Sequence, residues 1–110
     1  MTNDAITGKA MTVSVTQLSV SELCQLERIE KNLVVEVVEH GIASPLMGQS
    51  SRDWVFDGTT VHWIKKAVRL HQDLEIDWIA VSLVIDLLQQ KESLEQENER
   101  YRAQLGRFMD

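Results

Sequence analysis

The side chains best suited to chemistry in this sequence are one cysteine, Cys24, and three histidines, His40, His62 and His71. Cys24 and His40 lack the spacing of zinc ligands, and the other histidines are scattered along the chain. There is no glycine-rich phosphate loop and no nucleophile elbow. An enzyme needs a nucleophile, an acid–base pair or a metal set that can converge. The sequence therefore predicts no catalysis, no metal site and no cofactor, and Cys24 is interpreted as a small core residue.

The net charge of the chain indicates more about its partners than the cysteine and histidines do. The 110 residues include 11 basic and 17 acidic side chains, a net charge of −6. Non-specific DNA binding depends on neutralised phosphates, so this balance favours a basic protein partner over DNA.

The single cysteine excludes an internal disulfide and is consistent with a reducing, cytoplasmic compartment. Because no run of about 20 apolar residues exists, we expect no membrane segment. Residues 1–11 lack an apolar signal core and are expected to form a disordered leader.

Local signals predict the elements that would position a binding surface. Ser19 and Glu22 form a capping-box pattern, and Asp57 is suited to cap a helix that begins at Gly58. Gly41 fits the left-handed residue that follows a helix end, and Pro45 stops the helix from continuing. The predicted order is a strand over Thr12–Gln17, helices over Val20–Glu27 and Glu30–His40, a loop at Gly48–Arg52, a strand over Trp54–Phe56 and a helix over Gly58–Leu74. This is the order of a winged helix-turn-helix, so the predicted fold class is mainly α.

The helix over Glu30–His40 has two contrasting faces. Its apolar face carries Leu33, Val34, Val37 and Val38. Its opposite face carries Asn32, Glu36 and Glu39, with Val35 and His40 at the edges. In a helix-turn-helix this exposed face would read DNA, and here it is acidic. Carboxylates at these positions would repel phosphate groups.

The helix over Gly58–Leu74 is expected to pack on two sides, with Leu74 among its packed residues. Its basic cluster of Lys65, Lys66 and Arg69 is the one feature that favours nucleic acid. Acidic residues surround that cluster, so we interpret it as a solvated face with local charge pairing.

A long helix from Trp78 to about Phe108 is predicted, with Asp77 as its cap. Residues Ile79–Leu88 are apolar nearly all round and are expected to be buried on more than one side. Beyond them a heptad stripe continues, with polar Lys91 and Asn98 at its a-type positions. We interpret the stripe as a homodimer seam made by Leu87, Leu94, Asn98, Tyr101, Leu105 and Phe108. The alternative is that this tail folds back on its own domain or frays. The predicted organisation is a leader at 1–11, a winged-helix domain at 12–88 and a coiled-coil helix at 89–110.

Residues 18–77 resemble the amino-terminal domain of MerR-type regulators, which are DNA-binding dimers with a winged helix-turn-helix and a terminal coiled coil. Those regulators typically carry Arg-x-Tyr in the wing and basic or aromatic contacts in the second helix. Here Trp54-Val55-Phe56 stands in place of the first motif, and Val34-Val35-Glu36 in place of the second. The resemblance implies the fold, and these departures remove the usual DNA contacts.

Residues 12–108 are more similar to the CbpM family of chaperone modulators. The segments that carry the resemblance are Trp54-Val55-Phe56-Asp57, Ala67-Val68-Arg69-Leu70, Asp77-Trp78-Ile79-Ala80-Val81 and Leu94-Glu95-Gln96-Glu97-Asn98. The resemblance implies a dimer that binds the J-domain of CbpA, a DnaJ-like co-chaperone that also binds curved DNA, and inhibits both of its activities. It thereby also implies an association with the nucleoid through that partner.

An acidic surface would suit this role, because J-domains have a strongly basic second helix that docks on DnaK-type chaperones. The predicted partner-binding residues are Asn32, Val35, Glu36, Glu39 and Asp53. A second acidic candidate combines Asp53 and Asp57 with the corner at Asp73–Asp77. Two other functions stay open: a MerR-like DNA-binding transcription regulator, and a purely structural dimerisation module.

Overall fold

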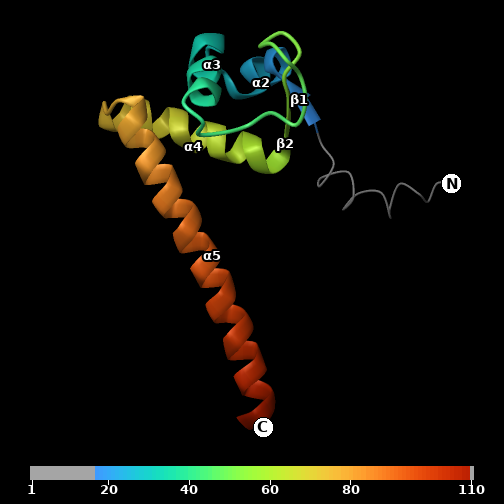
Figure 1. Cartoon of the computed structure of the whole chain (residues 1–110), viewed down its shortest axis with the longest axis vertical. Coiled ribbons are helices and arrows are strands. Elements are labelled where there is room, and N and C mark those ends of the chain that lie inside the picture. The colour runs from blue at the N-terminus through green and yellow to red at the C-terminus, as the bar shows by residue number, and fades with distance from the viewer. Residues whose placement is uncertain (1–16, 110) are drawn as a thin grey trace, which may run out of the picture.

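The computed structural model describes residues 17–109, with side chains as far as residue 107. Its elements in order are β1 (Gln17–Ser19), α2 (Val20–Glu27), α3 (Lys31–Glu39), β2 (Val55–Asp57), α4 (Gly58–Leu74) and α5 (Trp78–Met109). Figure 1 shows a head formed by all elements up to α4, from which α5 runs away as a single long helix. The mainly α, winged-helix fold is therefore confirmed. The predicted leader at 1–11 and most of the predicted strand Thr12–Gln17 lie outside the described residues.

The predicted helix caps are present. Ser19 and Glu22 exchange two hydrogen bonds, at 2.9 and 3.1 Å, which form the capping box of α2. The backbone N–H of Thr60 donates to Asp57 at 2.8 Å and begins α4. Asp77 accepts from the backbone N–H of Ala80 at 2.8 Å at the start of α5. These side chains satisfy amides that have no partner inside their own helices, which is why the helix starts could be predicted.

The small sheet connects the start of the head to α4. β1 pairs antiparallel with β2, and Leu18 lies opposite the fully buried Phe56. The wing returns along the other side of β2, where the N–H of Leu46 donates to the carbonyl of Val55 at 2.7 Å. β2 is shifted by one residue from the predicted Trp54–Phe56, because Asp57 belongs to both the strand and the cap of α4.

The core lies where α3, α4 and the first turns of α5 meet β2. Its fully or nearly fully buried members are Leu23, Val34, Val37, Phe56, Ile64, Ala67, Val81 and Ile85. The predicted apolar face of α3 is thus confirmed as the inward face. α4 packs between α3 and α5, in agreement with its predicted central place, except that Leu74 at its last position is exposed. That expectation was wrong because the chain turns at Glu75, so nothing in the described head covers Leu74.

One expectation for α5 was also wrong. Val81 and Ile85 are buried against the head, but Ile79 is 69% exposed and Leu83 and Leu87 are each 63% exposed. The first turns of α5 are therefore buried on one face only. Because these exposed residues repeat at intervals of four, they lie on one face, opposite to the buried one.

Candidate functional site

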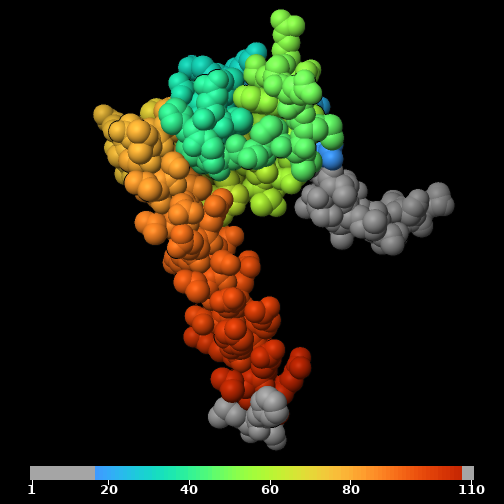
Figure 2. Space-filling model, in the orientation of Figure 1, coloured from blue at the N-terminus to red at the C-terminus, as the bar shows by residue number. Residues whose placement is uncertain are grey.

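The outward face of α3 is open to solvent. Asn32 and Glu39 are exposed, the Glu36 side chain is 45% exposed and Val35 is half-buried. Together with Lys31 they line a shallow hollow of about 460 Å³. In Figure 2 the turquoise α3 forms an uncovered part of the head surface. The structure therefore brings together four of the five predicted binding residues around an apolar centre at Val35.

Asp53 is the predicted binding residue that is not part of this group. It lies in the wing, where the hydroxyl of Ser50 donates to its carboxylate at 3.4 Å. Instead, the wing brings the neighbouring Ser51 and Arg52 to a second hollow of about 330 Å³, beside Lys31 at the start of α3. The acidic face of α3 is thus bordered at its N-terminal end by two cations.

Cys24 also lines the hollow beneath the wing and is half-buried. Burial raises the pKa of the Cys24 thiol, and the positive charge of Lys31 offsets part of that effect. A thiol with a raised pKa carries little thiolate at neutral pH and is a poor nucleophile. The packing of Cys24 against the core agrees with the structural interpretation of this residue.

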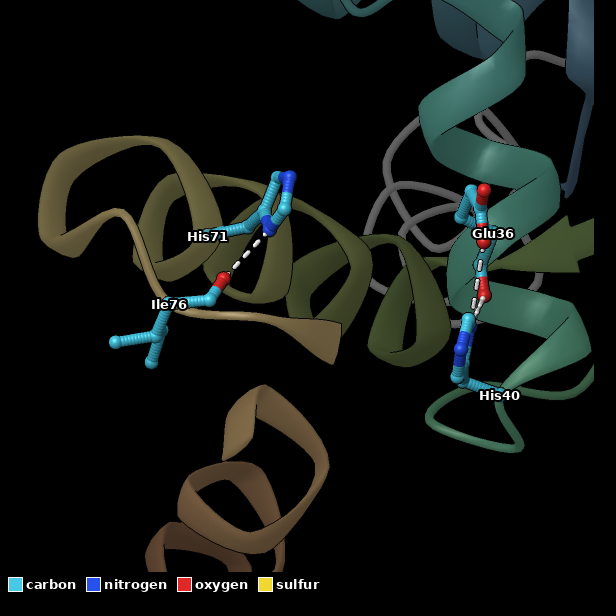
Figure 3. A network of polar contacts seen from close by, with 4 residues as sticks. All are labelled: Glu36, His40, His71 and Ile76. Carbon is cyan, nitrogen blue, oxygen red and sulfur yellow. Dashed lines mark hydrogen bonds and ion pairs between the residues drawn. The ribbon is translucent and has the colours of Figure 1, made fainter. Parts of the chain in front are cut away.

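His40 orients Glu36. The Nδ1–H of His40 donates to the backbone carbonyl of Glu36 at 2.9 Å and lies 3.4 Å from its carboxylate, as Figure 3 shows. Because a carbonyl only accepts, Nδ1 carries the proton in the neutral ring. This contact holds Glu36 at the C-terminal end of the exposed face. The ring of His40 also stacks on the ring of Trp78 in α5, with the ring centroids 6.2 Å apart. No residue near His40 in the sequence indicates this contact.

The basic cluster of α4 is partly neutralised by the head. Lys65 forms an ion pair with Glu27 of α2 at 3.1 Å. Lys65 is therefore charge-paired, but not with the neighbouring acids as expected: its partner comes from a distant element, and within the described residues no ion pair joins the cluster to those acids. This leaves Lys66, half-buried, and Arg69, exposed, as the other cations of that face.

The heptad stripe of α5 is exposed in the single chain. Leu87, Leu94, Tyr101 and Leu105 all present large apolar surfaces to solvent, and Asn98 is exposed among them. The side chain of Phe108 lies outside the described side chains. The exposed stripe begins earlier than predicted, at Ile79 and Leu83. Their spacing of four from Leu87 was a usable signal, but an apolar segment does not reveal which of its faces the head will cover.

Within residues 17–107 no three histidine, cysteine, aspartate or glutamate side chains are grouped so that they could hold a metal ion. None of the described helices combines the length and the apolar character needed to cross a membrane.

Comparison with known proteins gives a consistent picture. A model of the MerR HTH regulatory protein family matches residues 18–103. A protein named chaperone modulatory protein CbpM, from Pseudomonas putida, is 41% identical over 95 residues, which is 86% of this chain and 93% of the relative. A protein of the same name from Pseudomonas entomophila is 40% identical over 94 residues, which is 86% of this chain and 92% of the relative. Another from Coxiella burnetii is 33% identical over 96 residues, which is 87% of this chain and 89% of the relative. The similarity extends over the head and most of α5, and the names describe modulators rather than enzymes.

Proposed function

This chain belongs to the MerR helix-turn-helix family and, within it, to the chaperone modulatory proteins CbpM; from that premise we propose that it inhibits a DnaJ-like co-chaperone of the CbpA type. Its target is the basic J-domain of that co-chaperone. By covering this domain it excludes the DnaK-type Hsp70 chaperone and lowers DNA binding by the partner. It is not an enzyme and needs no cofactor.

The observation that carries the proposal is the charge of the α3 surface. A helix-turn-helix presents this face to DNA, but here Glu36 and Glu39 project from it and no described lysine or arginine lies beside them on the C-terminal half of the helix. The face repels phosphate and attracts a basic helix. We propose Asn32, Val35, Glu36 and Glu39 as its contact residues, with Asp53 contributing from the wing.

Charge alone would not give high affinity. Each exposed ion pair contributes about 0–1 kcal/mol, and complementary charge mainly sets specificity and association rate. Val35 is half-buried at the centre of the α3 hollow, where an apolar side chain of the partner could displace water. Apolar contact at Val35, beside the carboxylates of Glu36 and Glu39, is therefore the proposed source of much of the affinity.

We also propose that the protein is a homodimer joined through α5. The domain bounds we propose are a winged-helix domain at 12–88, which takes in the first turns of α5, and a coiled-coil segment at 89–110. The exposed stripe from Ile79 to Leu105 supports this arrangement, because large apolar side chains in such a row gain stability when a second helix covers them. Asn98 in the stripe would fix the register at some cost in stability. The location we propose is cytoplasmic, near the nucleoid when the partner is bound.

The winged helix-turn-helix fold itself favours a second candidate, a MerR-like transcription regulator. It would have to use Lys66 and Arg69, since Lys65 is paired with Glu27. A gel-shift with a random duplex library separates the two functions. Salt-sensitive, sequence-selective retention would support the regulator.

The experiment that tests the proposed function is calorimetry with the isolated J-domain, followed by competition with the DnaK-type chaperone. We expect saturable binding that the chaperone competes away. If no heat of binding is measured and DNA is selectively retained, the proposed function is wrong and the protein is a transcription regulator.

A further inference from the structure

A groove runs along α4 on the other side of α3 from the acidic hollow. Two depressions of about 610 and 660 Å³ form it, and they share Glu30, Leu33 and Gln72. Its floor is apolar and is made by Ile29, Leu33, Val68 and Ile76, which belong to the core or pack against it. α3 is therefore a ridge with a hollow on each side.

The two ends of the groove differ in charge. At the end near α2 the lining is mixed, because Arg28, Lys65 and Arg69 are offset by Glu27, Asp73 and the shared Glu30, and Lys65 is paired with Glu27. At the end near α5, the charged lining residues are Glu30, Glu75 and Asp77, and no lysine or arginine is among the described residues there. A cation of a ligand is therefore favoured at the α5 end, whereas Arg28 and Arg69, which form no ion pair within the described residues, can accept a carboxylate at the α2 end.

The carboxylates at the α5 end are available to a ligand. Within the described residues neither Glu30 nor Glu75 forms an ion pair, and Glu30 makes no capping hydrogen bond to α3. The position of this end is also fixed. His71 donates to the carbonyl of Ile76 at 2.7 Å, and its ring stacks on Trp78. Unpaired carboxylates beside an apolar floor suit a lysine or arginine whose methylene stem packs on that floor.

We propose that this groove binds a second segment of the same basic partner, a short amphipathic helix with a cation at one end and a carboxylate at the other. The proposal rests on the proposed function and extends its site across α3. The cationic end meets Glu30 and Glu75, apolar side chains pack over Leu33, and the carboxylate meets Arg69. From Lys65 to Asp73 the groove follows α4 for about 12 Å, enough for a helix of about two turns. The difference in charge between the two ends fixes the direction in which this segment lies.

The test is calorimetry of charge-reversed variants of the full chain with the full-length co-chaperone. Glu30→Lys with Glu75→Lys reverses the α5 end, and Arg69→Glu reverses the α2 end. The matched control is Glu92→Lys with Glu99→Lys, two exposed residues on the outer face of α5. We expect each groove variant to bind at least tenfold more weakly, and the control to bind within twofold of wild type. Circular dichroism verifies that each variant is folded.

Two results would overturn the inference, and they are distinguishable. If wild type binds and both groove variants bind equally well, the groove is not a contact surface, while the proposed function stands. If wild type itself does not bind the co-chaperone, the proposed function and the groove fail together.

Discussion

The imidazole of His71 stacks on the indole of Trp78, with ring centroids 4.0 Å apart and ring planes 13° from parallel. The same histidine donates its Nδ1–H to the carbonyl of Ile76 at 2.7 Å. His40, the residue that caps the C-terminus of α3, stacks on Trp78 as well. These contacts connect the ends of α3 and α4 to the start of α5, so they determine where the long helix leaves the head.

His71→Ala removes both the stack and the hydrogen bond. We expect it to lower the free energy of unfolding by about 1–2 kcal/mol, because an aromatic pair and a partly buried hydrogen bond each contribute of the order of 1 kcal/mol. Urea denaturation followed by circular dichroism measures this. Gln72→Ala, an exposed neighbour on α4, is the control, and equal stability of the two variants would contradict the role given to the stack.

Asp57 gives a pH-dependent prediction. The backbone N–H of Thr60, and then its hydroxyl, donate to the carboxylate and lower the pKa of Asp57 in the folded chain. The ionised form is therefore favoured by folding. The stability that this carboxylate contributes is complete above the pKa of Asp57 in the unfolded chain. It is lost as the pH falls through the lowered pKa of Asp57 in the folded chain. Asp57→Asn keeps an acceptor but removes the charge. We expect this variant to be less stable than wild type at neutral pH, by about 0.3–1 kcal/mol.

The difference between wild type and Asp57→Asn should disappear in acid, once the wild-type carboxylate is protonated. Thermal melts of both proteins across the acidic range measure this convergence. A stability gap that stays constant down to the lowest pH would show that the cap does not act through its charge.

Gly48 and Gly41 both have positive φ, at 109° and 73°, but only Gly48 is crowded. A Cβ on Gly48 would overlap the carbonyl oxygen of Asp53 and lie 2.7 Å from the backbone nitrogen of Trp54, whereas a Cβ on Gly41 meets nothing within 4 Å. Gly48→Ala should destabilise the chain by about 2 kcal/mol or more, because the wing backbone must shift. Gly41→Ala should cost only about 1 kcal/mol. Denaturant melts of the two variants compare them directly, and a smaller loss at Gly48 would contradict the packing of the wing.

The proposed dimer depends on the exposed stripe of α5. Leu94→Glu should shift the protein to monomers, since a charge at a d-type position cannot be covered by a second helix. Leu83→Glu should weaken association as well, because the stripe begins at Ile79. Sedimentation equilibrium measures both variants, with Glu92→Lys as the control outside the stripe. Unchanged association of Leu94→Glu would refute the seam.

Substituting Asn98 tests the same seam in the opposite direction. Asn98→Leu should raise the association constant, because a buried asparagine lowers coiled-coil stability while it fixes register. Weaker association of this variant would place Asn98 outside the interface.

Much of the head could be predicted from residues close together in sequence. Ser19 with Glu22, Asp57 and Gly41 act on backbone groups within a few positions, so their effect is visible in the sequence itself. The acidic face of α3 was predictable for a similar reason, since helical periodicity alone places Glu36 and Glu39 away from the core.

The rest depends on contacts between distant elements. Nothing near His71 in sequence indicates that its ring will stack on Trp78, and nothing near Lys65 indicates that it will pair with Glu27. The exposure of Ile79 and Leu83 was missed because an apolar segment does not show which of its faces the head will cover. The corner at Asp73–Asp77 was named from the sequence, but the groove itself was missed because Glu30 and Glu75 line one hollow only after α3 and α4 have packed.

The central claim is that the outward face of α3 binds a basic J-domain through its carboxylates. Calorimetry of Glu36→Lys with Glu39→Lys against the isolated J-domain tests it most directly, with Glu92→Lys and Glu99→Lys as the equally charged control. We predict binding at least tenfold weaker than wild type for the α3 variant, with the fold retained by circular dichroism and the control unaffected. Equal affinities of wild type and the α3 variant would contradict the claim.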